Sequence, residues 1–159
     1  MERYRVRVAG DDLVFSAAHF ITLAGSVCER LHGHNYRVAA EVSGPLDKNH
    51  YVVDFVALRE ALKAILDELD HRVLLPAEHP DVRVAADDRE VTATFADRRW
   101  VFPRGDCLLL PLPNTTAELL ARHIGRRLGD DLHRRTAIRP RKVRVELEEG
   151  FGQRAIWTA

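Results

Sequence analysis

The sequence predicts an α+β fold with an antiparallel sheet, and three observations support this expectation. Segments in which apolar and polar residues alternate, as they do in half-buried strands, occur near both ends of the chain. Two longer segments carry apolar residues at helical spacing. A group of short strands joins the two β-β-α halves that these segments form. The length of 159 residues is typical of one domain, which we expect to cover residues 1–159.

The first half of the chain contains several predicted strands and one predicted helix. Alternation indicates strands at residues 4–8, 13–16, 35–42 and 51–53. The first two are either a hairpin or one bulged strand. Asp54 is a suitable N-cap for a helix over residues 55–69, in which apolar residues recur at helical spacing. Asp70 and His71 then follow the C-terminus of this helix.

The second half begins with a predicted meander and continues with a helix and two strands. The expected strands cover residues 82–84, 91–95, 100–102, 107–110, 143–149 and 155–157. The second helix is expected over residues 116–128, with Gly129 as its stop. Thr115 and Glu118 have the spacing of a capping box at its start.

The composition excludes several classes of protein. The 24 Lys and Arg balance the 24 Asp and Glu, so no overall field draws the chain to nucleic acid or to an anionic membrane. No apolar run approaches the roughly 18 residues of a membrane span, and the first residues lack the apolar stretch of a signal peptide. Two cysteines are too few for a disulfide framework. We expect a cytoplasmic protein without nucleic-acid or membrane partners.

Histidines near the N-terminus suggest a metal site. His32 and His34 are separated by one residue, so they lie on the same face of a strand. His19 closes another predicted strand. Three imidazoles from two neighbouring strands suit a catalytic zinc, which takes three protein ligands and keeps one open position. Structural histidines with satisfied hydrogen bonds are the alternative.

Three further residues have a chemical and a structural interpretation. Cys28 is a small buried apolar residue, a thiol whose pKa is lowered beside a metal, or a fourth ligand that closes a structural zinc site. Asp70 and His71 are either a solvated helix end or a general acid–base pair. Among Glu146, Glu148 and Glu149, the sequence pattern alone favours none as a functional carboxylate.

Taken together, these motifs resemble the family of 6-pyruvoyl- and 6-carboxy-tetrahydropterin synthases. The resemblance runs in the family's order from residue 4 to residue 157. The matching segments are Phe15–His19, Cys28, Leu31–Tyr36, Val53–Phe55, Leu69–His71, Thr116–Glu118 and Val145–Glu149. The sequence His-Gly-His-Asn-Tyr, preceded by Ala-Ala-His and a cysteine, is its most specific part.

The resemblance implies a fold and a catalytic set. The fold is the tunnelling fold, an antiparallel four-stranded sheet with two helices on one face. Zinc is expected on His19, His32 and His34. Cys28, Asp70 and His71 are expected to transfer protons.

The resemblance also implies a pterin pocket. Glu149 corresponds to the family's pterin-anchoring glutamate, because the number of residues between it and Trp157 equals the number between the family glutamate and its closing aromatic residue. Thr116 and Glu118 are expected to line the same pocket.

Three departures from the family pattern accompany these matches. A β insertion at about residues 77–113 is longer than the loop of most members. Thr115 stands where bacterial members have proline, and Gly150 where the family has threonine. The insertion lies between two site motifs, so we expect it to bear on substrate entry, and hence on the exact substrate, more than on the chemistry.

The implied activity is that of a zinc-dependent lyase acting on 7,8-dihydroneopterin triphosphate. The spacing from Cys28 to His32 resembles that of bacterial members that form 6-carboxy-5,6,7,8-tetrahydropterin, on the path to queuosine-type deazapurines. The alternative is a 6-pyruvoyl-tetrahydropterin synthase, which eliminates triphosphate from the same substrate. A third branch, which cleaves the side chain for folate synthesis, has a glutamate near the cysteine position, where this chain has Glu29.

Two alternatives belong to other classes: a non-catalytic, zinc-stabilised pterin-binding protein, and a hydrolase that uses zinc-bound water. The family resemblance also implies an assembly. Three subunits would form one twelve-stranded barrel, and two barrels would stack into a homohexamer, which removes the exposed sheet edges.

Overall fold

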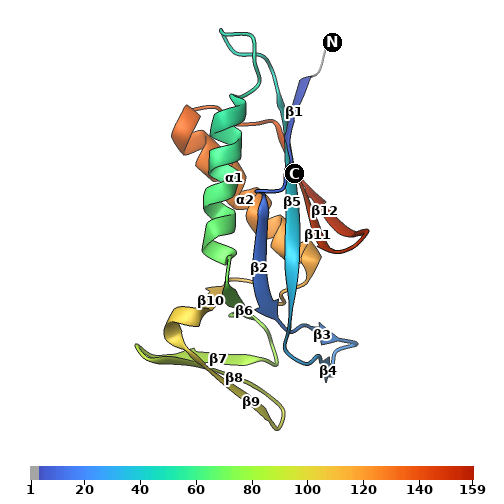
Figure 1. Cartoon of the computed structure of the whole chain (residues 1–159), viewed down its shortest axis with the longest axis vertical. Coiled ribbons are helices and arrows are strands. Elements are labelled where there is room, and N and C mark those ends of the chain that lie inside the picture. Colours follow the sequence, from blue (N-terminus) through green and yellow to red (C-terminus); the bar gives the residue numbers. More distant parts are fainter. Residues whose placement is uncertain (1–3) are drawn as a thin grey trace.

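The structure is a computed structural model that describes residues 4–159. A large mixed sheet forms the centre of the molecule, two helices cover one of its faces, and a small three-stranded sheet lies at one end (Figure 1). The strands of the large sheet are β1 (Tyr4–Val8), β2 (Val14–His19), β5 (His32–Gly44), β6 (Arg72–Pro76), β10 (Cys107–Leu110), β11 (Lys142–Gly150) and β12 (Gln153–Thr158). The α+β class that the sequence predicts is confirmed.

The large sheet differs from the expected four-stranded antiparallel sheet. Within residues 4–159 it has seven strands, in the order β10-β6-β2-β5-β11-β12, with β1 also paired to β5. The pairings β10–β6 and β2–β6 are parallel. The expectation of a wholly antiparallel sheet was therefore wrong. The sequence pattern does not predict β6 as a strand, and β6, which follows the first helix, runs parallel to both of its neighbours, β2 and β10.

The two N-terminal strands, β1 and β2, pair one after the other with the same long strand, β5. β2 pairs with the first half of β5, and β1 pairs with its second half, both antiparallel. The turn between them is closed by a hydrogen bond from the Leu13 amide to the Gly10 carbonyl oxygen. The structure thus favours one interrupted strand over a hairpin. Residues 51–53, which were expected to be a strand, form no strand, and Val52 and Val53 lie in a bend.

The helix α1 (Phe55–Leu69) has the bounds that its sequence predicts. Asp54 caps it by accepting a hydrogen bond from the Ala57 amide at 2.9 Å. Its apolar face is buried against the sheet and the second helix. Asp70, the C-cap, and His71, whose φ is +57°, turn the chain into β6.

The helix α2 (Ala117–Thr136) corrects two expectations. It does not stop at Gly129 but continues for two more turns, and Leu132 remains buried in the core. Its N-cap is Thr116, which accepts a hydrogen bond from the Leu119 amide, so the expected capping box of Thr115 with Glu118 was wrong. Thr115 is instead fully buried, and its hydroxyl donates to the Phe20 carbonyl oxygen.

The segment expected as a meander forms the small three-stranded antiparallel sheet. Its strands are β7 (Arg83–Ala86), β8 (Glu90–Phe95) and β9 (Arg98–Pro103), and a 3₁₀ turn (Arg104–Asp106) leads from it to β10. A second hydrophobic cluster, separate from the main core, packs this sheet against the end of the large sheet. We call this segment the β7–β9 sheet. A two-stranded ribbon, β3 (Thr22–Leu23) and β4 (Val27–Cys28), lies at the same end (Figure 1).

Neither helix within the described residues combines the length and the apolar character needed to cross a membrane.

Candidate active site

Three histidines meet where β2 ends and β5 begins. His19 is the last residue of β2, His32 is the first residue of β5, and the antiparallel register places these two opposite one another. His34 follows on the same face of β5, because strand residues two apart point the same way. The three ring centroids are separated by 4.8 to 5.2 Å. The clustering that the alternation predicts is confirmed.

Backbone carbonyl groups fix the orientation of two of the rings. The Nδ1 of His19 donates to the carbonyl oxygen of Thr115 at 3.0 Å, and the Nδ1 of His32 donates to that of Arg30 at 2.8 Å. A carbonyl oxygen can only accept, so each neutral ring has its lone pair on Nε2. Burial lowers the pKa of His19 to about 4, which keeps this ring neutral at physiological pH. Neutral imidazoles held in this way are suited to bind a metal.

The third ring provides the strongest indication of a metal. The Nε2 of His34 is buried and has no hydrogen bond of acceptable geometry, although Oε1 of Glu149 lies only 3.0 Å away. A buried polar atom without a partner is rare and calls for an explanation. One potential ligand atom from each of His19, His32, His34 and Glu149 lies within 4.8 Å of all the others. Three imidazoles are a donor set that fits zinc, and the Glu149 carboxylate lies beside them.

Glu149 reaches this cluster because it extends the inward-facing alternation of β11. Val145 and Leu147 are buried on the core side, and a register irregularity between Glu148 and Gly150 follows at the strand end. Glu148 faces the other side, where it accepts hydrogen bonds from the Gly152 amide and from Arg154. The alternation of buried Val143, Val145 and Leu147 could thus have indicated that Glu149, rather than Glu148, points to the inner face.

Cys28 lies in the short strand β4 near the same end and is half-buried. Within residues 4–159, its sulfur does not belong to the group of potential ligand atoms formed by the three histidines and Glu149. Burial raises the pKa of the Cys28 thiol, while the nearby guanidinium group of Arg98 acts in the opposite direction. A lowered thiol pKa would therefore require a further positive charge, such as a metal ion.

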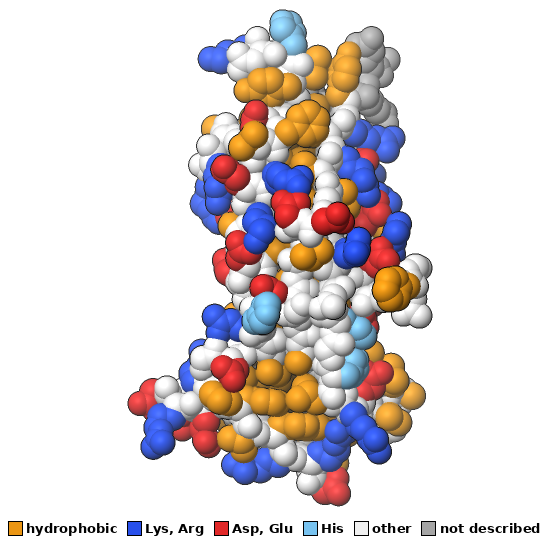
Figure 2. Space-filling model, in the orientation of Figure 1, with side chains coloured by type: hydrophobic (Ala, Val, Ile, Leu, Met, Phe, Trp, Pro, Cys, Tyr) orange, Lys and Arg blue, Asp and Glu red, His pale blue; other side chains and the backbone are white. Residues whose placement is uncertain are grey.

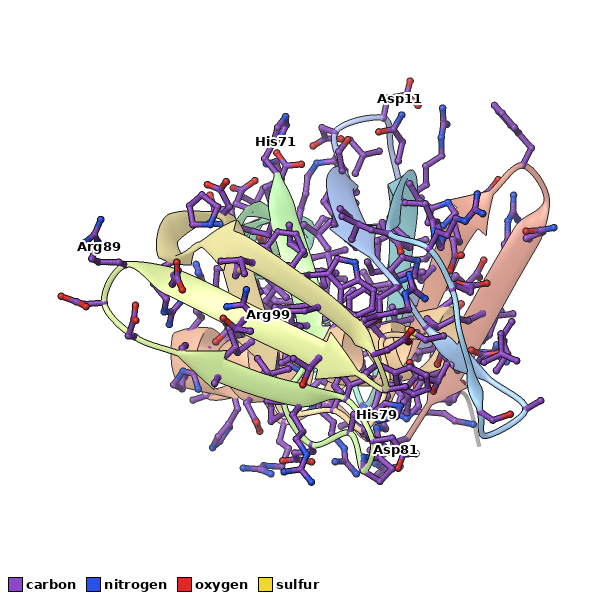
Figure 3. The ribbon with its side chains drawn as sticks, turned by 90° about the horizontal axis from the view of Figure 1, so that it is seen from below. Asp11, His71, His79, Asp81, Arg89 and Arg99 are labelled. Carbon is purple, nitrogen blue, oxygen red and sulfur yellow. The ribbon has the colours of Figure 1, made fainter. Side chains whose placement is uncertain are left out.

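Asp70 and His71 form a hydrogen-bonded pair. Oδ2 of Asp70 lies 2.8 Å from Nδ1 of His71, and Oδ1 accepts from the Ser16 amide at 2.7 Å. The Ser16 hydrogen bond and the neighbouring His71 lower the pKa of Asp70. The His71 side chain is 83% exposed and projects at the periphery of the view in Figure 3. A depression of about 440 Å³ is lined by both His71 and His34.

The three residues expected to bind the pterin line one pocket. Thr116, Glu118 and Glu149 all contribute to a pocket of about 390 Å³ between the start of α2 and the ribbon β3–β4. A second pocket, of about 360 Å³, is lined by Glu149 and His34. Glu149 therefore borders both pockets, and its carboxylate lies beside the histidine cluster.

Sequence reasoning missed the contacts that Thr115 and Arg98 make at this site, and it named Glu29 only for the folate-type branch. Thr115 orients His19 through its carbonyl oxygen, and its hydroxyl donates to the Phe20 carbonyl oxygen at 3.1 Å. Oε2 of Glu29 lies 3.9 Å from Nε2 of His32. Arg98, which comes from the β7–β9 sheet, contacts the backbone of Cys28. Thr115 and Arg98 act through contacts between distant segments, which no local pattern reveals.

The fold and site together define a class: an α+β protein with a candidate metal-binding cluster that opens into small-molecule pockets. Within that class, the chain belongs to the 6-pyruvoyl tetrahydropterin synthase family, whose sequence model matches residues 11–158. The family that the motifs indicate is confirmed.

Individual relatives agree with this assignment. A Methanocaldococcus jannaschii protein, provisionally named 6-carboxy-5,6,7,8-tetrahydropterin synthase, is 33% identical over 146 residues, which is 91% of this chain and 89% of the relative. A Plasmodium falciparum 6-pyruvoyl tetrahydropterin synthase structure superposes with a TM-score of 0.89 at 28% identity, covering 99% and 98% of the two chains. A Plasmodium vivax structure, described as a catalytic-residue mutant with alanine in place of a glutamate, has a TM-score of 0.90 at 25% identity and covers 100% and 99%.

Proposed function

We propose that this protein is a zinc-dependent lyase that converts 7,8-dihydroneopterin triphosphate to 6-carboxy-5,6,7,8-tetrahydropterin. The observation that carries the proposal is the cluster of His19, His32 and His34, whose potential ligand atoms lie within 4.8 Å of one another and of a Glu149 oxygen. The name of the Methanocaldococcus jannaschii relative supports the 6-carboxy product. This activity belongs to the biosynthesis of queuosine-type deazapurines.

His19, His32 and His34 are the proposed zinc ligands. When bound, zinc would supply Lewis-acid polarisation of an oxygen on the substrate side chain. The carbonyl groups of Thr115 and Arg30 orient two of the rings, which limits the rearrangement that metal binding requires.

Cys28, Asp70 and His71 are the proposed proton-transfer residues. Cys28 removes a proton from the substrate side chain, for which it must be a thiolate. His71 donates or relays a proton to the ring, and its hydrogen bond to Asp70 sets its orientation. The depression lined by His34 and His71 supports access to a proposed zinc ligand and to His71 from one cavity.

Glu149, Thr116 and Glu118 are the proposed pterin-binding residues. A carboxylate can accept two N–H donors from the guanidine-like edge of a pterin, which is a charge-assisted contact. Glu149 lines both pockets at the cluster, so a pterin bound there would extend its side chain towards the histidines. Glu118 lies across the same pocket in the first turn of α2.

We also propose that the protein acts as a cytoplasmic homohexamer, a dimer of trimers. β10 and β12 are the two ends of the strand order in the large sheet, and Ile156 on β12 is 54% exposed. Exposed strand edges tend to pair with another chain. Figure 2 shows a group of hydrophobic side chains on the lower part of one face, which a neighbouring subunit could cover. Light scattering should give six chain masses, whereas an active monomer would contradict the assembly.

A second function is supported by Glu29. Its carboxylate lies 3.9 Å from His32, and the Plasmodium vivax variant carries its substitution at a glutamate described as catalytic. If Glu29 rather than Cys28 takes the proton, the product would be that of side-chain cleavage or of the 6-pyruvoyl reaction. The names of the Plasmodium structures support the latter.

Product analysis tests these proposals. The zinc-loaded protein is incubated with 7,8-dihydroneopterin triphosphate, and the products are identified by mass. We expect 6-carboxy-5,6,7,8-tetrahydropterin together with acetaldehyde and triphosphate. Formation of 6-pyruvoyl-tetrahydropterin would contradict the proposal and support the 6-pyruvoyl reaction. Formation of a pterin with a shortened alcohol side chain would support side-chain cleavage instead. Binding without any conversion would leave a zinc-stabilised pterin-binding protein.

A further inference from the structure

Arg98 links the β7–β9 sheet to the backbone beside the histidine cluster. We propose that Arg98 is a positioning residue, which holds the peptide segment of Cys28 and Glu29 at the active site. This inference rests on the proposed function, because it assigns Arg98 to the placement of the two candidate bases. It also gives the β insertion at about residues 77–113 a role in the reaction.

The contacts of Arg98 are made to two consecutive carbonyl groups. Its Nη1 donates to the carbonyl oxygen of Cys28 at 2.6 Å and to that of Glu29 at 3.0 Å. Two bonds from one nitrogen to adjacent peptides restrict the rotation of the backbone between them. The side chains of both residues leave the backbone within this restricted stretch.

The segment that Arg98 holds has few other backbone contacts. β4 contains only two residues, and it pairs with only two residues of β3. The Glu29 amide donates to the Ile21 carbonyl oxygen at 3.0 Å. A ribbon of this length is marginal by itself, so an additional charged donor has a large share in fixing its position.

Arg98 is itself held in place by aromatic contacts. Its guanidinium carbon lies 4.5 Å from the centre of the Trp100 ring. Trp100 stacks on Phe20, with ring centres 4.5 Å apart and planes inclined by 17°. Phe20 directly follows the proposed ligand His19 and is buried in the second hydrophobic cluster. A continuous set of contacts thus joins Cys28 to the end of β2.

The alternation of β9 provides a matched control residue. Arg98, Trp100 and Phe102 lie on the partly buried face of the strand, whereas Arg99 and Val101 are exposed. Figure 3 looks at the molecule from the end that carries the β7–β9 sheet and labels Arg99 on it. A substitution at Arg99 changes the net charge as much as one at Arg98 but leaves the Cys28 carbonyl contact intact.

The experiment compares Arg98→Met, Arg98→Lys and Arg99→Met, each in a zinc-loaded Cys107→Ser background. Cys28 is then the only thiol, and its alkylation by iodoacetamide can be followed against pH without any turnover. We expect Arg98→Met to shift the alkylation profile to higher pH and to lower kcat by about tenfold to a hundredfold, the scale of a misplaced reacting group. KM should change much less, because no pterin-pocket residue is altered.

The lysine variant separates positioning from folding. Its ammonium group can donate to both carbonyl oxygens, so it should restore much of kcat and move the profile back towards that of Arg99→Met. An Arg98→Met profile and kcat matching those of Arg99→Met would overturn the proposal. So would an equal loss in Arg98→Met and Arg98→Lys. If the parent protein has no lyase activity, the proposed function fails, while the alkylation profiles still decide the role of Arg98.

Discussion

The two hydrophobic clusters of this protein differ in size and in their relation to the site. The main core joins both helices to the large sheet. Its buried side chains come from every strand of that sheet except β12, whose partly buried Trp157 packs against it. The second cluster has six buried members, which lie in or next to the β7–β9 sheet and the end of the large sheet. His19 ends β2 within the large sheet, and the next residue, Phe20, belongs to the second cluster. The candidate site therefore lies at the boundary between the two clusters. The main core supports the strands that carry the histidines, and the second cluster supports Phe20 and the segment of Cys28.

The largest effect should come from Cys28. Cys28→Ala removes the proposed base, so turnover should fall by about 10²- to 10⁴-fold. Zinc content and pterin binding should remain, as measured by metal analysis and titration. Cys107 packs in the same second cluster but on β10, so Cys107→Ser serves as the control with activity near that of the parent. Zinc loss in Cys28→Ala would instead identify Cys28 as a structural ligand.

Truncation of one buried residue in each cluster compares their contributions to stability. Leu62 on α1 and Val91 on β8 are both fully buried. Leu62→Ala should lower the free energy of unfolding by about 2–5 kcal/mol, because the main core can collapse only partly around the cavity. Val91→Ala removes less apolar volume and should cost about 1–2 kcal/mol. Urea denaturation measures both values, and a larger loss for Val91→Ala would reverse the ranking of the two clusters.

Substitution of Glu149, which lies on β11 of the large sheet, tests how the pterin is recognised. Glu149→Gln keeps the shape but removes the charge, so pterin binding should weaken by about 1.5–3 kcal/mol, the range for hydrogen bonds to charged groups. Glu148→Gln is the matched control, since Glu148 points to Arg154 on the other face. Calorimetric titration with a pterin measures both. A larger effect at Glu148 would show that the wrong glutamate has been assigned.

Two glycines of α2 provide a smaller test of packing in the main core. A Cβ at Gly125 would lie 2.3 Å from the Trp157 ring, whereas one at Gly129 would lie 3.7 Å from Val143. Gly125→Ala should therefore destabilise the protein by about 1–3 kcal/mol through overpacking. Gly129→Ala should stabilise it by up to about 1 kcal/mol through helix propensity. Thermal unfolding distinguishes the two, and a gain at both sites would show that Trp157 can move away freely.

Local patterns predicted those features that depend on neighbours in sequence. The bounds of α1 follow from its cap at Asp54 and its apolar spacing, and the alternation of β5 placed His32 and His34 on one face. The family motifs added the roles proposed for Cys28 and Glu149. Each of these signals lies within a short stretch of the sequence.

Features that depend on distant packing could not be predicted in this way. The extension of α2 beyond Gly129 depends on tertiary packing: Leu132 is buried in the main core, so a glycine that would favour the end of an isolated helix does not end this one. The parallel pairing of β6 and the contact of Arg98 with Cys28 join segments far apart in the sequence. Thr115 has a capping pattern, yet burial directs its polar groups to Phe20 and His19.

The ligands of the metal are the central claim, and X-ray absorption at the zinc edge tests it most directly. The zinc-loaded protein should show three imidazole nitrogens at about 2.0–2.1 Å and an oxygen in the remaining position. His34→Ala should lose this signal together with the metal. A sulfur ligand at about 2.3 Å would contradict the account, because it would make Cys28 a fourth ligand and the zinc a closed structural site.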